Sequence, residues 1–289
     1  MPTVLPEIIA IFSSMGWAGD SILVRLGTRK SSIFAAMFMS FLVSATCVWS
    51  YLLATTPLDF LSSPAMIYFL ISGCLQPLCA RALFYEGLTR IGVSRAGPLR
   101  GAEPFFAAAI AVAFLHERPG VAVYSGTVLI VASVWVVSGI HGGERKWRLL
   151  DSAFPLGAAL VSAVSQSLRK QGLNILPNPF IAAVTVTSTS LVLLSVFLWS
   201  TNRIRVLHME RGSFFYFLGA AAIATIAQVL NFIALGRGQV SAIIPLLNTT
   251  PLFILVFSKI FLRGVERVTL RIVLGAILMV SGVVLITSR

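Results

Sequence analysis

Five ionisable side chains lie within long apolar stretches of the sequence. They are Asp20, Arg81, Glu86, Arg100 and Glu103. Inside a membrane-spanning helix a charged side chain costs about 2.5 to 3.5 kcal/mol on insertion scales, so such residues face the protein interior and often mark function. These residues are therefore the first candidates for binding or proton chemistry.

Arg100 and Glu103 have the i, i+3 spacing that places two side chains on one face of a helix. A hairpin turn near Ile91 would bring Arg81 to the level of Gly101, so we expect Arg81, Arg100 and Glu103 to form one cluster. Two cations and one anion leave a surplus positive charge. That charge either binds a carboxylate or phosphate, or belongs to an ion-pair network that fixes helix packing.

A second carboxylate, Asp20, lies near Trp17 and Ser21 in the first apolar stretch. Burial favours the protonated form of a carboxyl group, so Asp20 or Glu103 is a candidate for binding a coupling proton. The alternative is that Asp20 reaches the membrane interface and pairs there with Arg25.

The elements that must position these residues are membrane helices. Soluble domains carry about 25% charged residues, whereas this chain of 289 residues has 11% charged and 57% hydrophobic residues. Its apolar blocks of roughly twenty residues match the length of a membrane-spanning helix. The net charge of +12 lies mostly in short loops, as expected for orientation signals and lipid contacts. The expected partners are a lipid bilayer and a small molecule, with no nucleic acid.

Prolines, glycines and charged clusters divide the chain into ten expected helices. They cover residues 5–24, 33–54, 64–88, 92–115, 119–140, 154–169, 179–200, 214–235, 240–262 and 268–287. The predicted fold is an all-α integral membrane protein of ten transmembrane helices. The loops are too short to hold a soluble domain, and the sequence gives no oligomeric state.

The two halves of the chain resemble each other at a constant offset. Ser94, Pro98 and Pro104 in the first half match Ser241, Pro245 and Pro251 in the second, and Glu117 matches Glu266 after a short insertion. We predict a first repeat over 1–141, a charged linker over 142–153 and a second repeat over 154–289. Because each repeat holds five helices, the second copy inserts upside down. Inverted repeats are typical of transporters, with a site near the midplane between the copies.

The second repeat offers uncharged polar groups at the corresponding positions. Gln228 matches Arg81, and Asn231 and Asn248 lie close by. The predicted substrate-binding residues are Arg81, Arg100, Glu103, Trp17, Gln228, Asn231 and Asn248. The alternative for the amides is interhelical hydrogen bonding, worth about 0.6 kcal/mol each.

Four prolines fall inside expected spans, namely Pro98, Pro104, Pro245 and Pro251. Each removes a backbone hydrogen bond and is predicted to kink its helix. Such kinks favour either gating beside a cavity or static curvature.

Motifs for enzyme chemistry are missing from the sequence. His116, His141 and His208 lie at separate span ends, and no zinc-protease, nucleophile-elbow, Walker or dinucleotide motif occurs. We therefore expect no catalytic site, no metal and no cofactor, and a protein that is not an enzyme.

The repeated Ser–x3–Pro–x5–Pro pattern, the helix-end Glu117 and Glu266, and the GWAGDS stretch at residues 16–21 together carry a family resemblance. The chain resembles the EamA-type branch of the drug/metabolite transporter superfamily over nearly its whole length. The resemblance implies a two-repeat secondary carrier with a central cavity, no cofactor and both termini in the cytoplasm. Loop charge predicts the reverse orientation, because most Lys and Arg follow odd-numbered spans.

The resulting hypothesis is a secondary active transporter of a small polar metabolite, amino-acid-like or an organic anion, working by alternating access. Export is the expected direction of transport. The family resemblance also implies a location in a bacterial inner membrane. The first alternative is an uptake carrier for an organic anion or phosphorylated compound. An alternative of another class is a lipid-modifying membrane enzyme or a non-transporting scaffold.

Overall fold

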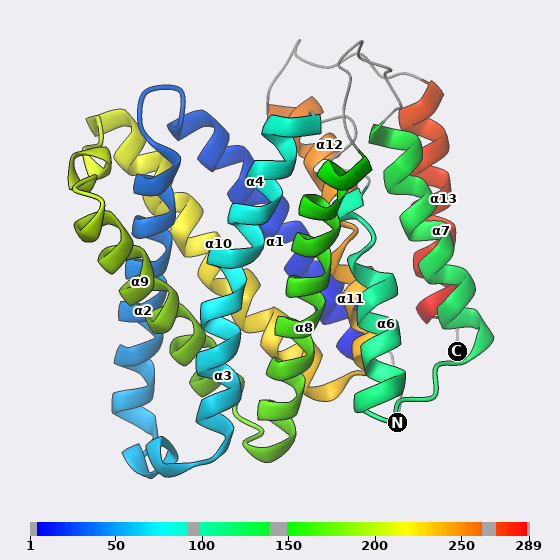
Figure 1. Cartoon of the computed structure of the whole chain (residues 1–289), viewed down its shortest axis with the longest axis horizontal. Helices are drawn as coiled ribbons and strands as arrows, with labels where there is room; N and C mark the ends of the chain where they lie inside the picture. Colours follow the sequence, from blue (N-terminus) through cyan, green and yellow to red (C-terminus); the bar gives the residue numbers. More distant parts are fainter. Residues whose placement is uncertain (1–4, 92–98, 139–148, 262–269, 288–289) are drawn as a thin grey trace.

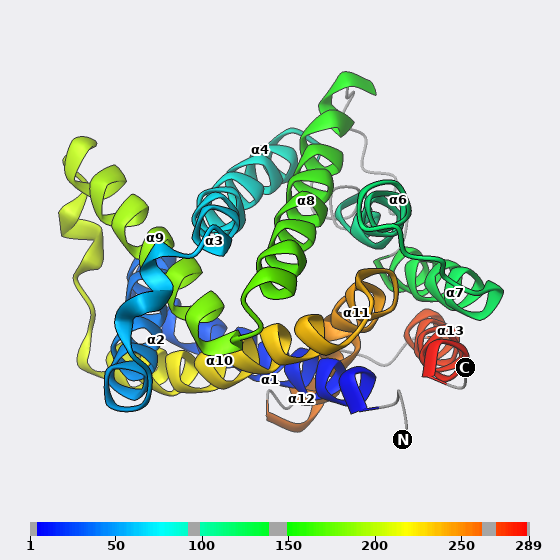
Figure 2. The ribbon, with the colours of Figure 1, turned by 90° about the horizontal axis from the view of Figure 1, so that it is seen from below.

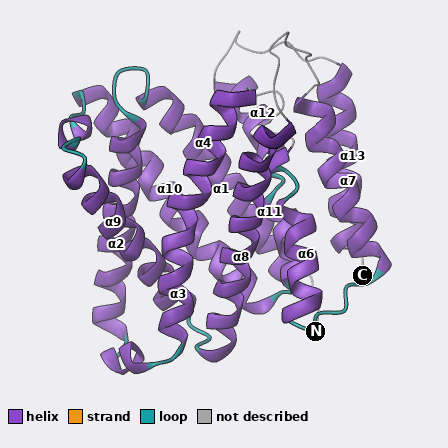
Figure 3. Ribbon diagram, in the orientation of Figure 1, coloured by secondary structure: helices purple, strands orange, loops and turns teal. Residues whose placement is uncertain are grey.

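The computed structural model describes residues 5–91, 99–138, 149–261 and 270–287, and every regular element in these ranges is a helix (Figures 1 and 3). The helices of the first half are α1 (Leu5–Gly27), α2 (Ile33–Thr55), α3 (Ala65–Gly73), α4 (Ala80–Ile91), α6 (Glu103–Phe114) and α7 (Val121–Ser138). Those of the second half are α8 (Ala153–Ile175), α9 (Pro179–Ser200), α10 (Arg211–Arg237), α11 (Val240–Leu247), α12 (Thr250–Phe261) and α13 (Leu270–Thr287). Short turns η1 (Leu58–Ser62), η2 (Cys74–Cys79), η3 (Leu149–Ser152) and η4 (Ile204–Leu207) complete the chain.

The outer surface of the bundle is apolar. Large hydrophobic side chains face outward along most helices, including Phe114, Val121 and Trp199 at 73%, 84% and 74% exposure. Such a surface matches a lipid environment and not water. Five helical stretches are long and apolar enough to cross a membrane: Leu5–Gly27, Ile33–Thr55, Ala65–Phe84, Pro179–Ser200 and Arg211–Arg237. The chain is a multi-pass membrane protein.

The helices form ten spans in two inverted groups of five. In Figure 1, α1 rises from the face that holds both termini, whereas α8 starts at the opposite face and descends. The packing is reciprocal: α1 packs on α10, while α8 packs on α3 and α4, and α7 pairs with α13. Seen from below in Figure 2, the two repeats surround a common centre. We call the face with the termini the lower face and the opposite one the upper face.

Small residues let the crossing helices approach closely. A Cβ atom on Gly126 of α7 would lie 2.7 Å from the carbonyl oxygen of Gly282 on α13, and one on Gly282 would lie 2.7 Å from the carbonyl oxygen of Gly126. On the other side of the molecule, Ser13 Oγ of α1 donates to the carbonyl oxygen of Ala227 on α10, at 2.7 Å. Close contacts between small residues hold membrane helices together where lipid offers no hydrophobic driving force.

Two spans expected as continuous helices are interrupted. The third span breaks inside η2, where Gln76 has the non-helical angles φ −131° and ψ 129°. The ninth span divides into α11 and α12, with Asn248 as the C-cap of α11. In the fourth span, α6 begins at Glu103 with Ala102 as its N-cap. Breaks of this kind are tolerated at membrane depth where the backbone lines a cavity.

The prolines relate to these breaks differently from the predicted kinks. Pro104 and Pro251 each occupy the first turn of a new helix, α6 or α12, where the absent N–H leaves no helical hydrogen bond unmade. Pro245 does lie inside α11, and Pro98 lies outside the described residues. Pro104 and Pro251 thus start helical segments and do not bend continuing ones.

The sixth span is longer than the sequence indicates. It was expected to end at Arg169, but α8 runs on to Ile175, so Arg169 and Lys170 lie within the helix and not in a loop. The basic pair looks like a loop charge in the sequence, yet Arg169 is only 7% exposed. The hydrogen bonds described below explain how the helix accommodates both cations.

Candidate functional site

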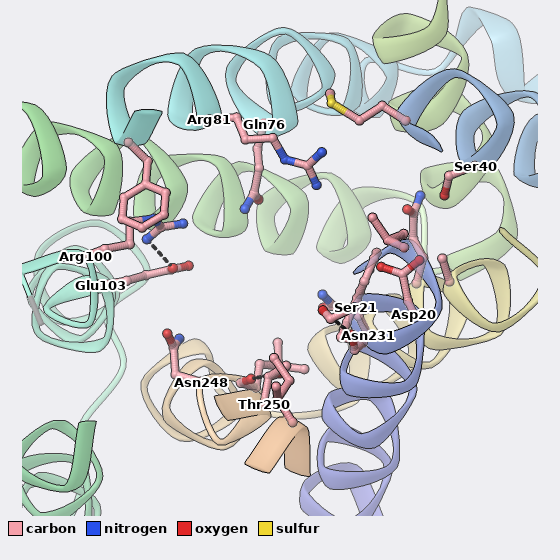
Figure 4. Close-up of a pocket in the computed structure, with 18 of the residues that line it drawn as sticks. Asp20, Ser21, Ser40, Gln76, Arg81, Arg100, Glu103, Asn231, Asn248 and Thr250 are labelled. Carbon is pink, nitrogen blue, oxygen red and sulfur yellow. Dashed lines mark hydrogen bonds and ion pairs between the residues drawn. The ribbon is translucent and has the colours of Figure 1, made fainter. Parts of the chain in front are cut away.

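A cavity of about 1060 Å³ lies at the centre of the bundle, between the two repeats (Figure 4). Its walls come from α1, α2, α4, α8, α9, α10, α12 and the breaks in the third, fourth and ninth spans. The volume fits a small metabolite, since ligand pockets commonly measure about 300 to 1,000 Å³.

The structure gathers all predicted binding and proton-coupling residues around this one cavity. Those lining it are Trp17, Asp20, Arg81, Arg100, Glu103, Gln228, Asn231 and Asn248. Glu86 does not line the cavity: it lies exposed in the middle of α4 and accepts a 2.7 Å hydrogen bond from Arg90 Nε. The residues share one site because the repeats bring α1, α4, α8 and α10 to the same centre.

The expected three-residue charge cluster divides into a pair and a separate cation. Arg100 Nη1 donates to Glu103 Oε2 at 2.7 Å, and Arg100 Nη2 donates to Ser162 Oγ at 2.6 Å. Glu103 is 6% exposed, so this ion pair is largely desolvated. Arg81 makes no ion pair among the described residues and extends from α4 into the cavity (Figure 4).

Asp20 also lines the cavity and, within the described ranges, takes part in no ion pair. The expected alternative placed it against Arg25 at the membrane interface. Arg25 lines the same cavity one turn nearer the upper face, but the structure records no ion pair between the two. The carboxyl group of Asp20 therefore faces the cavity contents.

The amides of the second repeat are partly engaged in packing. Gln228 Nε2 donates to Thr187 Oγ1 at 2.5 Å and to the Ala183 carbonyl oxygen at 3.3 Å. Asn248 Nδ2 donates to the carbonyl oxygen of Ile244, one turn earlier in α11. Asn231 differs, because its side-chain oxygen is buried and has no hydrogen-bond partner among the described residues. Gln76 Oε1, on the opposite wall, is in the same condition.

The polar cavity residues missed in the sequence include Gln76, Gln166 and Arg169. Gln166 and Arg169 belong to α8, which also buries Ser162 and Ser165. The positions 162, 166 and 169 follow the i, i+4, i+7 spacing of one helix face. That polar stripe was the available signal in the sequence, where the basic pair Arg169 and Lys170 resembles the charged end of a span.

The cavity extends toward the upper face, where Arg25, Thr28 and Ile33 at the end of α1 and the start of α2 contribute to its lining.

At the lower face, the connection between α10 and α11 is held by two charged side chains. Glu117 accepts hydrogen bonds from Val240 N, Ser241 N and Ser241 Oγ at 2.7, 3.0 and 2.7 Å.

Lys170 holds the other end of the same connection. Its ammonium group donates to the carbonyl oxygens of Leu235, Gly236 and Gly238 at 3.0, 3.2 and 2.9 Å. A carboxylate at a helix N-terminus and an ammonium at a helix C-terminus are both favourable placements for the helix dipole. The lower connection between α10 and α11 is thus fastened at both ends.

A second, smaller pocket of about 520 Å³ lies on the lower side and is lined by Thr55, Asn178 and Phe232 among others. Phe232 is 1% exposed, and the Arg169 guanidinium carbon lies 5.3 Å from its ring centroid. The Phe232 ring therefore stands between the Arg169 side of the central cavity and the lower pocket.

A polar cavity at the centre of inverted helical repeats defines the class of membrane transporters. The EamA-like transporter family model matches residues 4–139 and 152–288, and the chain belongs to this family. An uncharacterized transporter of Archaeoglobus fulgidus is 22% identical over 283 residues, covering 98% of each chain. A crystal structure with 14% sequence identity shares the fold, with a TM-score of 0.77 over 97% of this chain and 95% of the other.

Proposed function

We propose that this membrane transporter is a secondary active carrier of a small polar, anionic metabolite that works by alternating access. One observation carries the proposal: a metabolite-sized cavity with polar walls from both repeats reaches the upper face, while hydrogen bonds fasten the helix connection at the lower face. In alternating access, one repeat moves against the other around a fixed midplane site. Export across a bacterial inner membrane is the proposed setting.

The charge of the cavity supports an anionic substrate. Four arginines line it, Arg25, Arg81, Arg100 and Arg169, against the two carboxylates Asp20 and Glu103. A water-filled cleft with an excess of one charge concentrates ligands of the opposite charge. The amides and the tryptophan, Gln228, Asn231, Asn248 and Trp17, supply hydrogen bonds and an apolar surface for the rest of the molecule.

The same excess of arginine favours a second candidate, an uptake carrier for an organic anion or a phosphorylated compound. The two candidates share the cavity and differ in the direction of net transport. Arginine suits both carboxylate and phosphate because its planar donors bind two oxygens at once.

Counterflow in proteoliposomes tests the proposal. Vesicles holding the purified chain are loaded with a high concentration of one unlabelled metabolite, and uptake of the same labelled metabolite is followed over time. We expect transient accumulation for at least one anionic metabolite, which an enzyme or a scaffold would not produce. Absence of counterflow with all amino acids, hydroxy acids, dicarboxylates and sugar phosphates tested would contradict the proposal. For a compound that does show counterflow, transport driven by pH gradients of either sign reports the direction of net transport.

A further inference from the structure

Arg169 is a buried cation that makes no ion pair among the described residues, although the Glu103 carboxylate interacts with it electrostatically at longer range. It is 7% exposed and lines the central cavity. Its Nε donates to Ser72 Oγ at 2.7 Å, its Nη1 donates to Gln166 Oε1 at 3.2 Å, and its guanidinium carbon lies 5.3 Å from the Phe232 ring centroid. A hydroxyl, an amide and an aromatic ring orient the guanidinium without neutralising it.

The guanidinium keeps unused binding capacity. It has five N–H donors in a planar fork, and among the described residues its hydrogen bonds go only to Ser72 and Gln166. Arg100 is different, because Glu103 supplies its counter-charge at 2.7 Å. A buried charge without a directly contacting counter-charge is unfavourable unless another group compensates it. The cavity beside Arg169 is where such a group can enter.

Asn231 offers the complementary group on the neighbouring helix. It is 6% exposed, lines the cavity, and its Oδ1 has no hydrogen-bond partner in the described structure. An unpaired buried acceptor destabilises the empty site, so a hydrogen-bond donor on a ligand would bind there favourably.

Both residues lie in the last third of their helices. Both α8 and α10 descend to the lower face (Figure 1), ending at Ile175 and Arg237. At a rise of 1.5 Å per residue, Arg169 and Asn231 each lie about 9 Å along the helix axis from the end of their helix. Phe232, which follows Asn231 directly, is the ring that the Arg169 guanidinium covers, and both Arg169 and Asn231 line the central cavity.

Resting on the proposed function, we propose that Arg169 and Asn231 bind the polar head of the substrate: Arg169 a carboxylate, Asn231 Oδ1 an amino or hydroxyl group of the same molecule. The substrate class is then amino or hydroxy carboxylic acids. Arg169 replaces Arg100 as the main anion-binding residue, since Arg100 is already neutralised.

Binding measured without transport tests this assignment. The purified full-length chain is titrated with a panel of amino and hydroxy carboxylic acids and with the primary amide of each, with Kd taken from calorimetry. We expect at least one acid to bind the unmodified chain more tightly than its amide. Arg169→Gln should weaken that acid roughly 10- to 150-fold, the range for a hydrogen bond to a charged group, and leave the amide within about threefold.

Two further variants serve as the control and the reference for this measurement. Arg205→Gln, at an exposed arginine in η4 outside the cavity, should leave acid binding unchanged. Arg169→Lys, which retains the charge but not the planar fork, should bind the acid with intermediate affinity. It serves as the folded reference if Arg169→Gln is lost during purification, because a Kd equal to that of the unmodified chain would contradict the assignment.

Asn231→Leu probes the second contact. It should weaken acids that carry an amino or hydroxyl group and spare the same acids without that group. The assignment is overturned if no acid is preferred over its amide, or if acid and amide weaken equally in Arg169→Gln. Failure of counterflow with intact acid selectivity would instead contradict the transport proposal, so the two failures are distinguishable.

Discussion

The cavity arginines differ in what surrounds them, and this sets their roles. Arg100 donates hydrogen bonds to Glu103 and to Ser162. Its guanidinium therefore holds the start of α6 against α8. Arg169 is oriented by neutral groups, and Arg81 makes no ion pair in the described part of the chain. A pair of opposite charges inside the protein fixes geometry, whereas an unneutralised cation retains affinity for a ligand.

At the same scale, Asp20 is the stronger of the two candidates for proton coupling. Glu103 is held by Arg100 at 2.7 Å, while Asp20 faces the cavity without such a pair. The charged groups that share the cavity with Asp20 are Arg25, Arg81, Arg100, Glu103 and Arg169.

We predict that Asp20→Asn abolishes the pH dependence of transport, because an amide cannot take up or release a proton. Counterflow, which needs no proton gradient, should persist. The measurement is the initial rate of proteoliposome transport between pH 5.5 and 8.5. A variant that keeps the full pH dependence of the unmodified chain would remove Asp20 from the coupling step.

At the scale of elements, we expect the connection between α10 and α11 to control the opening of the lower face. Glu117 binds the N-terminus of α11, and Lys170 binds the C-terminal carbonyl groups of α10. Glu117 comes from the first repeat and Lys170 from the second, so the connection is held from both halves of the molecule.

We predict that Glu117→Gln opens the lower face. The glutamine side chain loses the charge and offers one acceptor oxygen to Val240 N, Ser241 N and Ser241 Oγ. A single cysteine at Ser40, a cavity residue (Figure 4), reports the change once Cys47, Cys74 and Cys79 are replaced by alanine. In sealed vesicles, an impermeant maleimide on the lower side should label the Glu117→Gln variant several-fold faster.

Ser241→Ala is the matched control for that experiment. It removes only the hydroxyl contact and leaves both backbone hydrogen bonds to Glu117, so its effect should be smaller. Equal labelling of the unmodified and Glu117→Gln chains from the lower side would show that this contact does not keep the lower face closed.

Element boundaries show how far the sequence alone could lead. Long uniform apolar runs such as α2 and α9 were placed within a residue or two, because length and hydrophobicity suffice for them. The predicted end of α8 was too early, because Arg169 and Lys170 resemble the charges of a loop. Their burial depends on Ser72 of α3 and on the carbonyl oxygens that end α10, and such tertiary partners are not visible along one segment.

The breaks in the spans were anticipated only as proline kinks. Ser–x3–Pro–x5–Pro in the two halves indicates where helix geometry changes. Whether the chain bends or starts a new helix depends on the groups that satisfy the freed backbone, as with the cap at Asn248. The break at Gln76 is not repeated in the second half, where α10 runs unbroken from Arg211 to Arg237. The comparison of the two halves therefore could not predict it.

At the scale of the whole molecule, the inverted repeat explains why one cavity collects residues distant in sequence. Asp20, Arg81 and Arg100 come from one repeat, while Arg169 and Asn231 come from the other. The internal repeat made this convergence predictable, because inverted copies place their sites on a shared axis. The division of roles among the cations was not predictable, since it follows from contacts between helices.

At this scale too, the central cavity and the lower pocket suggest a path of movement. Phe232 lies between the cavity beside Arg169 and the lower pocket of about 520 Å³. Release of the lower connection would allow α10 and α11 to shift and connect these spaces. The upper-facing and lower-facing states are then two arrangements of the same packed repeats.

One-sided labelling of the Ser40→Cys reporter, with Glu117 intact, tests this central claim most directly. Without substrate, the impermeant maleimide should react from the upper side and not from the lower side. Adding a compound that drives counterflow should produce labelling from the lower side while labelling from the upper side slows. Labelling from both sides without that compound, or from one side regardless of it, would contradict alternating access through this cavity.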